Sequence, residues 1–142
     1  MIPDTLLRLA INRLSVLKPH EKQCLEDIVD SEALFRALTP ALLSQIVGRN
    51  IRTMDARGDE LLGQAERDAR YLRSRGCHVL SIRDDRYPAA LREIYDPPFL
   101  LYVRGSLPAN DRPAVAVVGT RRPTAAATIG ARKLGQELAR NG

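Results

Sequence analysis

The sequence has no tryptophan, and aromatic residues make up only 4% of its 142 positions. A surface built from many stacked aromatic rings is therefore not expected. Long apolar runs are also missing, since the longest are about five residues (Phe99 to Val103 and Ala114 to Val118) against the roughly 18 that a membrane-spanning helix needs. The charged residues near the N-terminus interrupt any apolar signal core. These absences argue against a membrane protein and a secreted one.

Cysteines and histidines are few and scattered. The two cysteines, Cys24 and Cys77, and the two histidines, His20 and His78, lack the spacing of metal-binding motifs. We expect reduced thiols in a cytoplasmic protein, with no metal and no cofactor. The acidic pair Asp84–Asp85 precedes a Tyr-Pro turn and is predicted to be a solvated loop. No Ser/His/Asp or Cys/His set is recognisable, so an enzyme is not expected.

The positive charge is concentrated near the end of the chain. The formal net charge is +5, from 22 basic and 17 acidic residues. Residues 99–142 hold seven of the bases and two of the acids, whereas residues 1–98 hold 15 of each. A local positive field attracts polyanions, and arginine, which dominates here, suits bidentate phosphate contacts. Charge alone is equally compatible with a basic surface that has no partner.

The first 76 residues are predicted to form a small all-α domain. Apolar residues at helical spacing predict a first helix over residues 6–14, and Pro19 suits the first turn of a second. Ser31 and Thr39 are predicted N-caps of two further helices, the second of which ends at Gly48. A longer helix is predicted from Asp55 to Arg75, before Gly76.

The pattern changes to strands after Gly76. The predicted strands are His78–Ile82, Phe99–Arg104 and Ala114–Val118, with a short helix at Ala89–Ile94 and a longer one at Thr124–Arg140. The third strand is apolar at every position, which is typical of a buried, parallel strand. The last helix is predicted to face inward through an apolar stripe made of Ala127, Ala131, Leu134 and Leu138.

The segment from Ala114 to Thr124 predicts the strand, glycine turn and helix start that open a nucleotide-type α/β fold. Backbone N–H groups and the helix dipole favour a phosphate at such a helix start. The residues of the predicted site are Gly119, Thr120, Arg121, Arg122 and Thr124. Arg121 stands where a dinucleotide-binding fingerprint has its second glycine, and no Walker A sequence is present. The alternative is that the glycine only turns the chain and the arginines are solvated.

Several short motifs in a fixed order resemble the DprA/Smf family, the DNA-processing proteins of bacterial natural transformation. They are Tyr87–Pro88, Leu91, Ile94–Pro98, Leu101–Gly105 and Gly119–Thr124. The resemblance implies an α/β protein, with a SAM-like or helix-hairpin-helix-like domain at residues 1–76. An extended Rossmann-like domain would then begin in residues 77–142, which hold only its N-terminal part.

The resemblance also implies a function: binding single-stranded DNA, protecting incoming strands and helping to load the RecA recombinase. The family's Gly-Ser/Thr-Arg element falls on Gly119, Thr120 and Arg121. Arg121 is therefore the first candidate for a contact to a DNA phosphate, and Arg122 the second. Three bases of the following helix are weaker candidates, namely Arg132, Lys133 and Arg140.

The chain departs from the family pattern in three places. Ala126–Ala127 stand where the family usually has Tyr-Gly. The turn at Ser15–Pro19 lacks the glycines of a phosphate-binding helix-hairpin-helix clasp, so the helical domain is expected to mediate protein contacts or to be a packing appendage. The family's later strands and self-association surface are absent. We therefore expect a fragment, whose homodimer would need the missing C-terminal part.

Two other functions stay open at this point. One is a nucleotide-monophosphate hydrolase on a related Rossmann fold, although its P-G-G-x-G-T loop is not present in residues 1–142. The other is a helical adaptor that binds proteins and retains only a remnant of the α/β part. Three results would separate these functions. Single-strand binding that weakens steeply with salt would indicate the DNA-binding protein. Release of base from a nucleotide would indicate the hydrolase, and neither result would indicate the adaptor.

Overall fold

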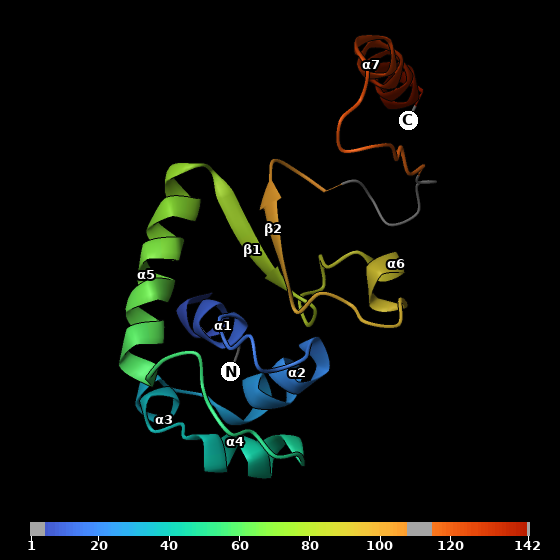
Figure 1. Ribbon diagram of the computed structural model, residues 1–142. Helices are drawn as coiled ribbons and strands as arrows, with labels where there is room; N and C mark the ends of the chain where they lie inside the picture. The colour runs from blue at the N-terminus through green and yellow to red at the C-terminus, as the bar shows by residue number, and fades with distance from the viewer. Residues whose placement is uncertain (1–4, 108–114, 142) are drawn as a thin grey trace. The chain divides into compact units, whose positions relative to one another are not determined.

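The chain forms two compact units in a computed structural model, Met1–Leu107 and Pro108–Gly142. The structure describes residues 5–107 and 115–141 (Figure 1). The first unit mixes helices with a small sheet, which agrees with the predicted α/β class. The compact units divide after residue 107, whereas the predicted domain boundary lies after residue 76. That boundary concerns the domains of the resembled family, and it stays a prediction.

Five helices occur before the first strand, as the sequence predicts. They are α1 (Thr5–Asn12), α2 (Pro19–Ile28), α3 (Glu32–Arg36), α4 (Pro40–Val47) and α5 (Gly58–Ser74). The Ser31 hydroxyl accepts a hydrogen bond from the Leu34 N–H at 3.3 Å, and Thr39 caps α4 in the same way. Gly48 ends α4 with a φ of 69°, a left-handed conformation that favours glycine. No helix in the described residues is both long and apolar enough to cross a membrane.

Two of the predicted strands form and pair with each other. Strands β1 (Cys77–Ser81) and β2 (Leu100–Arg104) are antiparallel, with Cys77 opposite Arg104 and Ser81 opposite Leu100. The short helix α6 (Ala89–Arg92) lies between them in the sequence. Each strand begins one residue from its predicted position, β1 earlier and β2 later.

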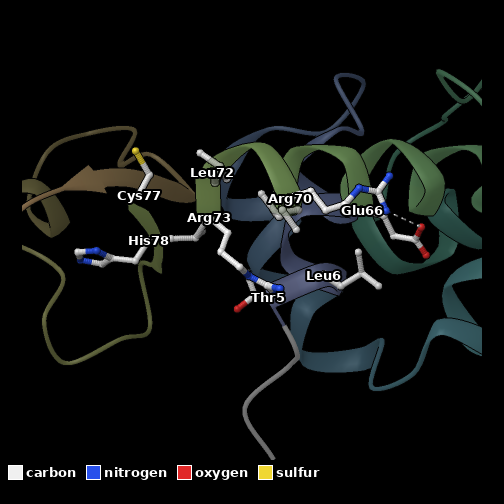
Figure 2. A pocket seen from close by; sticks show the side chains of 11 residues that line it. Thr5, Leu6, Glu66, Arg70, Leu72, Arg73, Cys77 and His78 are labelled. Atoms are coloured by element: carbon white, nitrogen blue, oxygen red, sulfur yellow. Dashed lines mark ion pairs between the residues drawn. The ribbon is translucent and has the colours of Figure 1, made fainter. Parts of the chain in front are cut away.

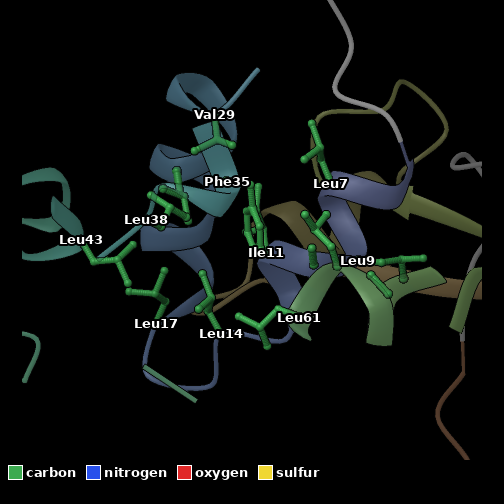
Figure 3. Close-up of a cluster of buried hydrophobic side chains, with 14 of the residues drawn as sticks. Leu7, Leu9, Ile11, Leu14, Leu17, Val29, Phe35, Leu38, Leu43 and Leu61 are labelled. Carbon is green, nitrogen blue, oxygen red and sulfur yellow. The ribbon is translucent and has the colours of Figure 1, made fainter. Parts of the chain in front are cut away.

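The hydrophobic core of the first unit is built around α1. Ile11 and Leu14 are fully buried, and Phe35 of α3 and Leu61 of α5 join them in one cluster (Figure 3). Phe99, next to β2, belongs to the same cluster. The sheet therefore shares its core with the helices, which explains why residues 77–107 belong to the first compact unit.

A buried ion network links the helices to the loop after β1. The Arg8 guanidinium donates to Glu26 at 2.8 Å and to Asp84 at 3.1 Å. The Ser81 hydroxyl donates to both Glu26 carboxylate oxygens at 3.2 Å. Asp85 is exposed, but the prediction of a solvated loop is wrong for Asp84, which is half-buried and paired. The residues of this network are far apart in sequence, so no local pattern indicates it.

A second carboxylate, Glu21, fixes the start of α2. It accepts a hydrogen bond from the Lys18 N–H at 2.7 Å, and its ion pair with Arg49 has an N–O distance of 2.5 Å. Arg49 also donates to the Val16 carbonyl at 2.6 Å, so the turn before α2 is joined to the loop after α4. The hydrogen bond from Arg49 lowers the pKa of Glu21 to about 2.

We expect the Arg49→Ala substitution to destabilise the protein near neutral pH but much less in acid. A depressed carboxyl pKa stabilises the fold above the unfolded value of 4.5, and this contribution is lost as the pH falls towards 2. Urea unfolding of wild type and variant between pH 6 and pH 2.5 measures how the difference in stability depends on pH. The exposed Arg52, substituted in the same way, is the control. A difference between Arg49→Ala and wild type that stayed constant with pH would contradict the expectation.

The second unit contains α7 (Ala125–Arg140) but not the predicted third strand. Residues 115–118 are irregular and exposed, and Val118 is 89% exposed, so the prediction of a buried strand is wrong there; Ala114 lies outside the described residues. The prediction that the apolar stripe of α7 faces inward is also wrong, since Leu134 is 50% exposed. A strand needs a neighbour for its backbone hydrogen bonds, and the described part of this unit offers none.

Candidate functional site

The predicted phosphate-binding residues lie together in the exposed segment that leads into α7. Gly119, Thr120, Arg121, Arg122 and Thr124 are all exposed. Within the described ranges, neither of the two arginines has an ion-pair partner. Their charge is therefore available to a ligand.

Hydroxyl groups organise the backbone of this segment. The Thr120 hydroxyl accepts a hydrogen bond from the Arg122 N–H at 3.3 Å. The Thr124 hydroxyl accepts one from the Ala127 N–H at 3.2 Å and so caps α7. Ala125 and Ala126 supply the first two N–H groups of the helix, and these have no acceptor in residues 115–141. Such groups, with the helix dipole, favour an anion.

Gly119 has no structural requirement for glycine within the residues that the structure describes. Its φ is not positive, and a Cβ added there would meet no heavy atom within 4 Å. The surroundings of Gly119 therefore leave room for a ligand to approach the backbone closely.

The described part of the second unit is strongly basic, with five basic residues and one acid, Glu137. That acid accepts from Arg140 at 3.2 Å, which leaves Arg140 the weakest of the predicted phosphate contacts. Arg132 and Lys133 are exposed and unpaired within the same residues. Apart from this one pair, nothing in the described part of the unit neutralises the positive charge.

The turn at Ser15–Pro19, between α1 and α2, is not open to phosphate. The Ser15 N–H donates to the Asp55 carboxylate at 2.8 Å, and the Lys18 N–H donates to Glu21. Burial alone would raise the pKa of Asp55, but hydrogen bonds from Ser15 and neighbouring N–H groups hold it below its usual value. Two carboxylates therefore occupy the amides that a phosphate-binding clasp would offer.

An open pocket of about 520 Å³ lies between α1, α5 and β1. Figure 2 shows Glu66, Arg70 and Arg73 along α5, with Cys77 and His78 on the adjoining strand. Both cysteines of the chain are free thiols, and no cluster of metal ligands occurs in residues 5–107 or 115–141. The expectation that the protein is not an enzyme remains a prediction.

The sequence reasoning did not identify a second basic surface at the end of α5. Residues 67–76 hold four arginines and one acid. Arg75 lies over the ring of the exposed Tyr71, with 5.4 Å between the guanidinium carbon and the ring centroid. The spacing of four residues between a tyrosine and an arginine on a helix was the available signal.

Known proteins resemble parts of this chain. The family model for DNA recombination-mediator protein A matches residues 78–142. The protein Smf of Borreliella burgdorferi is 41% identical over 56 residues, which are 39% of this chain and 18% of that protein. No solved structure gives a significant match.

Two proteins named DNA processing protein DprA are also similar. The one from Bacillus subtilis is 34% identical over 71 residues, which cover 49% of this chain and 24% of the relative. The one from Streptococcus pneumoniae is 56% identical over 41 residues, which cover 29% and 14%. The chain thus spans less than a quarter of the length of each of these curated relatives.

Proposed function

Because residues 78–142 place this chain in the DprA/Smf family, we propose that it is a DNA-processing protein that binds single-stranded DNA. The DNA phosphates lie at the segment from Gly119 to Thr124. Its cellular role is to protect incoming DNA in natural transformation and to help load the RecA recombinase, in the cytoplasm. The helices represent the SAM-like part of the family and residues 77–142 the beginning of its Rossmann-like part. Self-association as a homodimer is part of the same proposal.

The observation that carries the proposal is the unneutralised charge at the start of α7. Arg121 and Arg122 are exposed and unpaired within the described residues, next to the two open N–H groups of the helix. A phosphate placed there gains charge-assisted hydrogen bonds without displacing a carboxylate. A DNA backbone repeats this group, and the basic residues along α7 supply further contacts.

A non-enzymatic role suits the described residues of the second unit better than the hydrolase alternative. Release of the base from a nucleotide needs a positioned acid or base at the glycosidic bond that is broken. Glu137 is the one acid in the described part of this unit, and it is paired with Arg140 near the other end of α7. The adaptor alternative is not supported by any specific observation.

The Arg121→Ala substitution is expected to weaken single-strand binding severalfold at low salt. Loss of one phosphate contact should also reduce the slope of log affinity against log salt by about 0.7. Fluorescence anisotropy with a labelled oligothymidine, measured across a salt series, tests this. Arg140→Ala is the matched control, since Arg140 already has an acidic partner in the same unit, and its effect should be smaller.

Two results would contradict the proposed function. Wild-type protein that fails to bind the oligonucleotide at low salt would contradict single-strand binding altogether. Equal slopes for wild type and Arg121→Ala would contradict the assignment of the phosphate contact to Arg121. Release of free base from a nucleotide would favour the hydrolase instead.

A further inference from the structure

Two of the four tyrosines of the chain line one shallow hollow on the first unit. Tyr71 on α5 is 59% exposed and Tyr102 on β2 is 51% exposed. They line a hollow of about 290 Å³ together with Leu72 and Asp68. This volume is near the lower end of the roughly 300–1,000 Å³ of small-molecule pockets, so the hollow suits one flat group rather than a large ligand.

The ring of Tyr102 is held in place while its face stays accessible. The Asn12 side-chain amide donates a hydrogen bond to the Tyr102 hydroxyl at 3.0 Å. Tyr102 also lies opposite Val79 in the antiparallel pair, so its backbone is fixed by the sheet. An exposed ring of restricted mobility loses little entropy when a second ring stacks on it.

The surroundings of the hollow are positively charged. Arg75 lies over Tyr71, and Arg104 shares a face of the sheet with Tyr102, because alternate residues of a strand point the same way. The acid in the hollow, Asp68, is neutralised by Arg13, which donates to both of its carboxylate oxygens at 2.8 Å. Arg75 and Arg104 have no ion-pair partner in the described residues.

We propose that Tyr71 and Tyr102 form a base-stacking site for single-stranded DNA, with Arg75 and Arg104 facing its phosphates. Exposed aromatic rings beside unpaired arginines combine the two features that bind single strands without sequence preference. A duplex keeps its bases stacked inside, and an acidic peptide carries charge without planar rings, so neither uses both features. The inference rests on the proposed function and adds a second contact region, in the first unit, to the one at Arg121.

The Tyr71→Ala substitution in the full chain separates stacking from charge. We expect about tenfold weaker binding to a 15-residue oligothymidine, as for loss of one base–aromatic stack, with an unchanged salt slope. An abasic strand of equal length should bind wild type and variant alike, because it lacks the stacking partner. Tyr71→Phe should retain wild-type affinity.

The matched control is Tyr95→Ala, because Tyr95 is a fully exposed tyrosine of the same unit that does not line the hollow. This substitution should leave the affinity for oligothymidine unchanged. Because the chain has no tryptophan, Tyr71→Trp adds a direct reporter. Its fluorescence should be quenched by oligothymidine and not by the abasic strand.

The outcomes distinguish this inference from the proposed function. Unchanged affinity in Tyr71→Ala, with intact wild-type binding, overturns the stacking site and leaves the site at Arg121 standing. The stacking site is also overturned if Tyr71→Ala loses as much affinity for duplex DNA, for the abasic strand or for polyglutamate as it loses for oligothymidine. None of these three ligands offers an unpaired base. Wild-type protein that does not bind oligothymidine overturns both.

Discussion

Replacing Glu26 with alanine is expected to lower the free energy of unfolding of the first unit by about 3–5 kcal/mol. Glu26 is 4% exposed, and its carboxylate is the acceptor for both Arg8 and Ser81. Arg83 adds a third contact, with 3.6 Å between its Nε and a Glu26 oxygen. The substitution removes the acceptor and leaves a cavity beside these donors.

The large effect comes from what remains after the substitution. Arg8 is 6% exposed and keeps its positive charge, since an arginine cannot be deprotonated in a protein. Its partner Asp84 compensates only in part, because the Arg8 Nε that bonded Glu26 then has no acceptor. A buried donor without a partner carries the full desolvation penalty.

Urea unfolding followed by circular dichroism measures this loss, with the slope against urea as a check that the same surface unfolds. Glu66→Ala is the matched control, because Glu66 is an exposed glutamate whose pair with Arg70 spans 3.9 Å. Its effect should stay below about 0.5 kcal/mol. Equal effects of the two substitutions would show that the network around Glu26 does not stabilise the fold.

Sequence reasoning succeeded where the determining interactions are local. The caps at Ser31 and Thr39 act within three residues, and Gly48 acts on the last turn of its own helix. It failed for the Arg8 network, whose ion pairs join residues 18 and 76 positions apart. Such ion pairs depend on how several helices and strands pack together, so the sequence of any single helix or strand carries no pattern that indicates them.

The third predicted strand failed for a different physical reason. The apolar residues up to Val118 have the composition of a buried strand, but a strand also needs a neighbour to pair with. β1 and β2 pair with each other in the first unit, and the described part of the second unit contains no strand. The sequence pattern of a segment indicates that it can form a strand, but it does not indicate whether another strand is available to pair with it.

The candidate site was predictable in its residue types but not in its full extent. Arg121 and Arg122 stand out by charge and by their place before a predicted helix, which Thr124 caps in the structure. Tyr71 and Tyr102 are distant in sequence and meet only because β2 returns beside β1, next to α5. Their juxtaposition therefore needed the folded structure.

Gly58→Ala is expected to destabilise the first unit by about 1–3 kcal/mol, although alanine is the better helix former. Gly58 is the first residue of α5 and packs against α3. A Cβ added there would lie 2.7 Å from the Arg36 Cα and 2.8 Å from the Phe35 carbonyl oxygen. Both are backbone atoms, and the fully buried Phe35 side chain anchors α3 in the core, so the clash cannot be relieved by a side-chain rotation.

Gly63→Ala in the same helix provides a control, because its expected effect on stability has the opposite sign. An added Cβ at Gly63 would approach only the end of the Arg67 side chain, at 3.9 Å, so the helix propensity of alanine acts alone. That substitution should stabilise the unit by about 0.5–1 kcal/mol. Urea unfolding of both variants gives the comparison under identical conditions. If Gly58→Ala were as stable as Gly63→Ala, α3 and α5 would not pack as closely in solution as the structure places them, because backbone atoms at 2.7 Å leave no room for a methyl group.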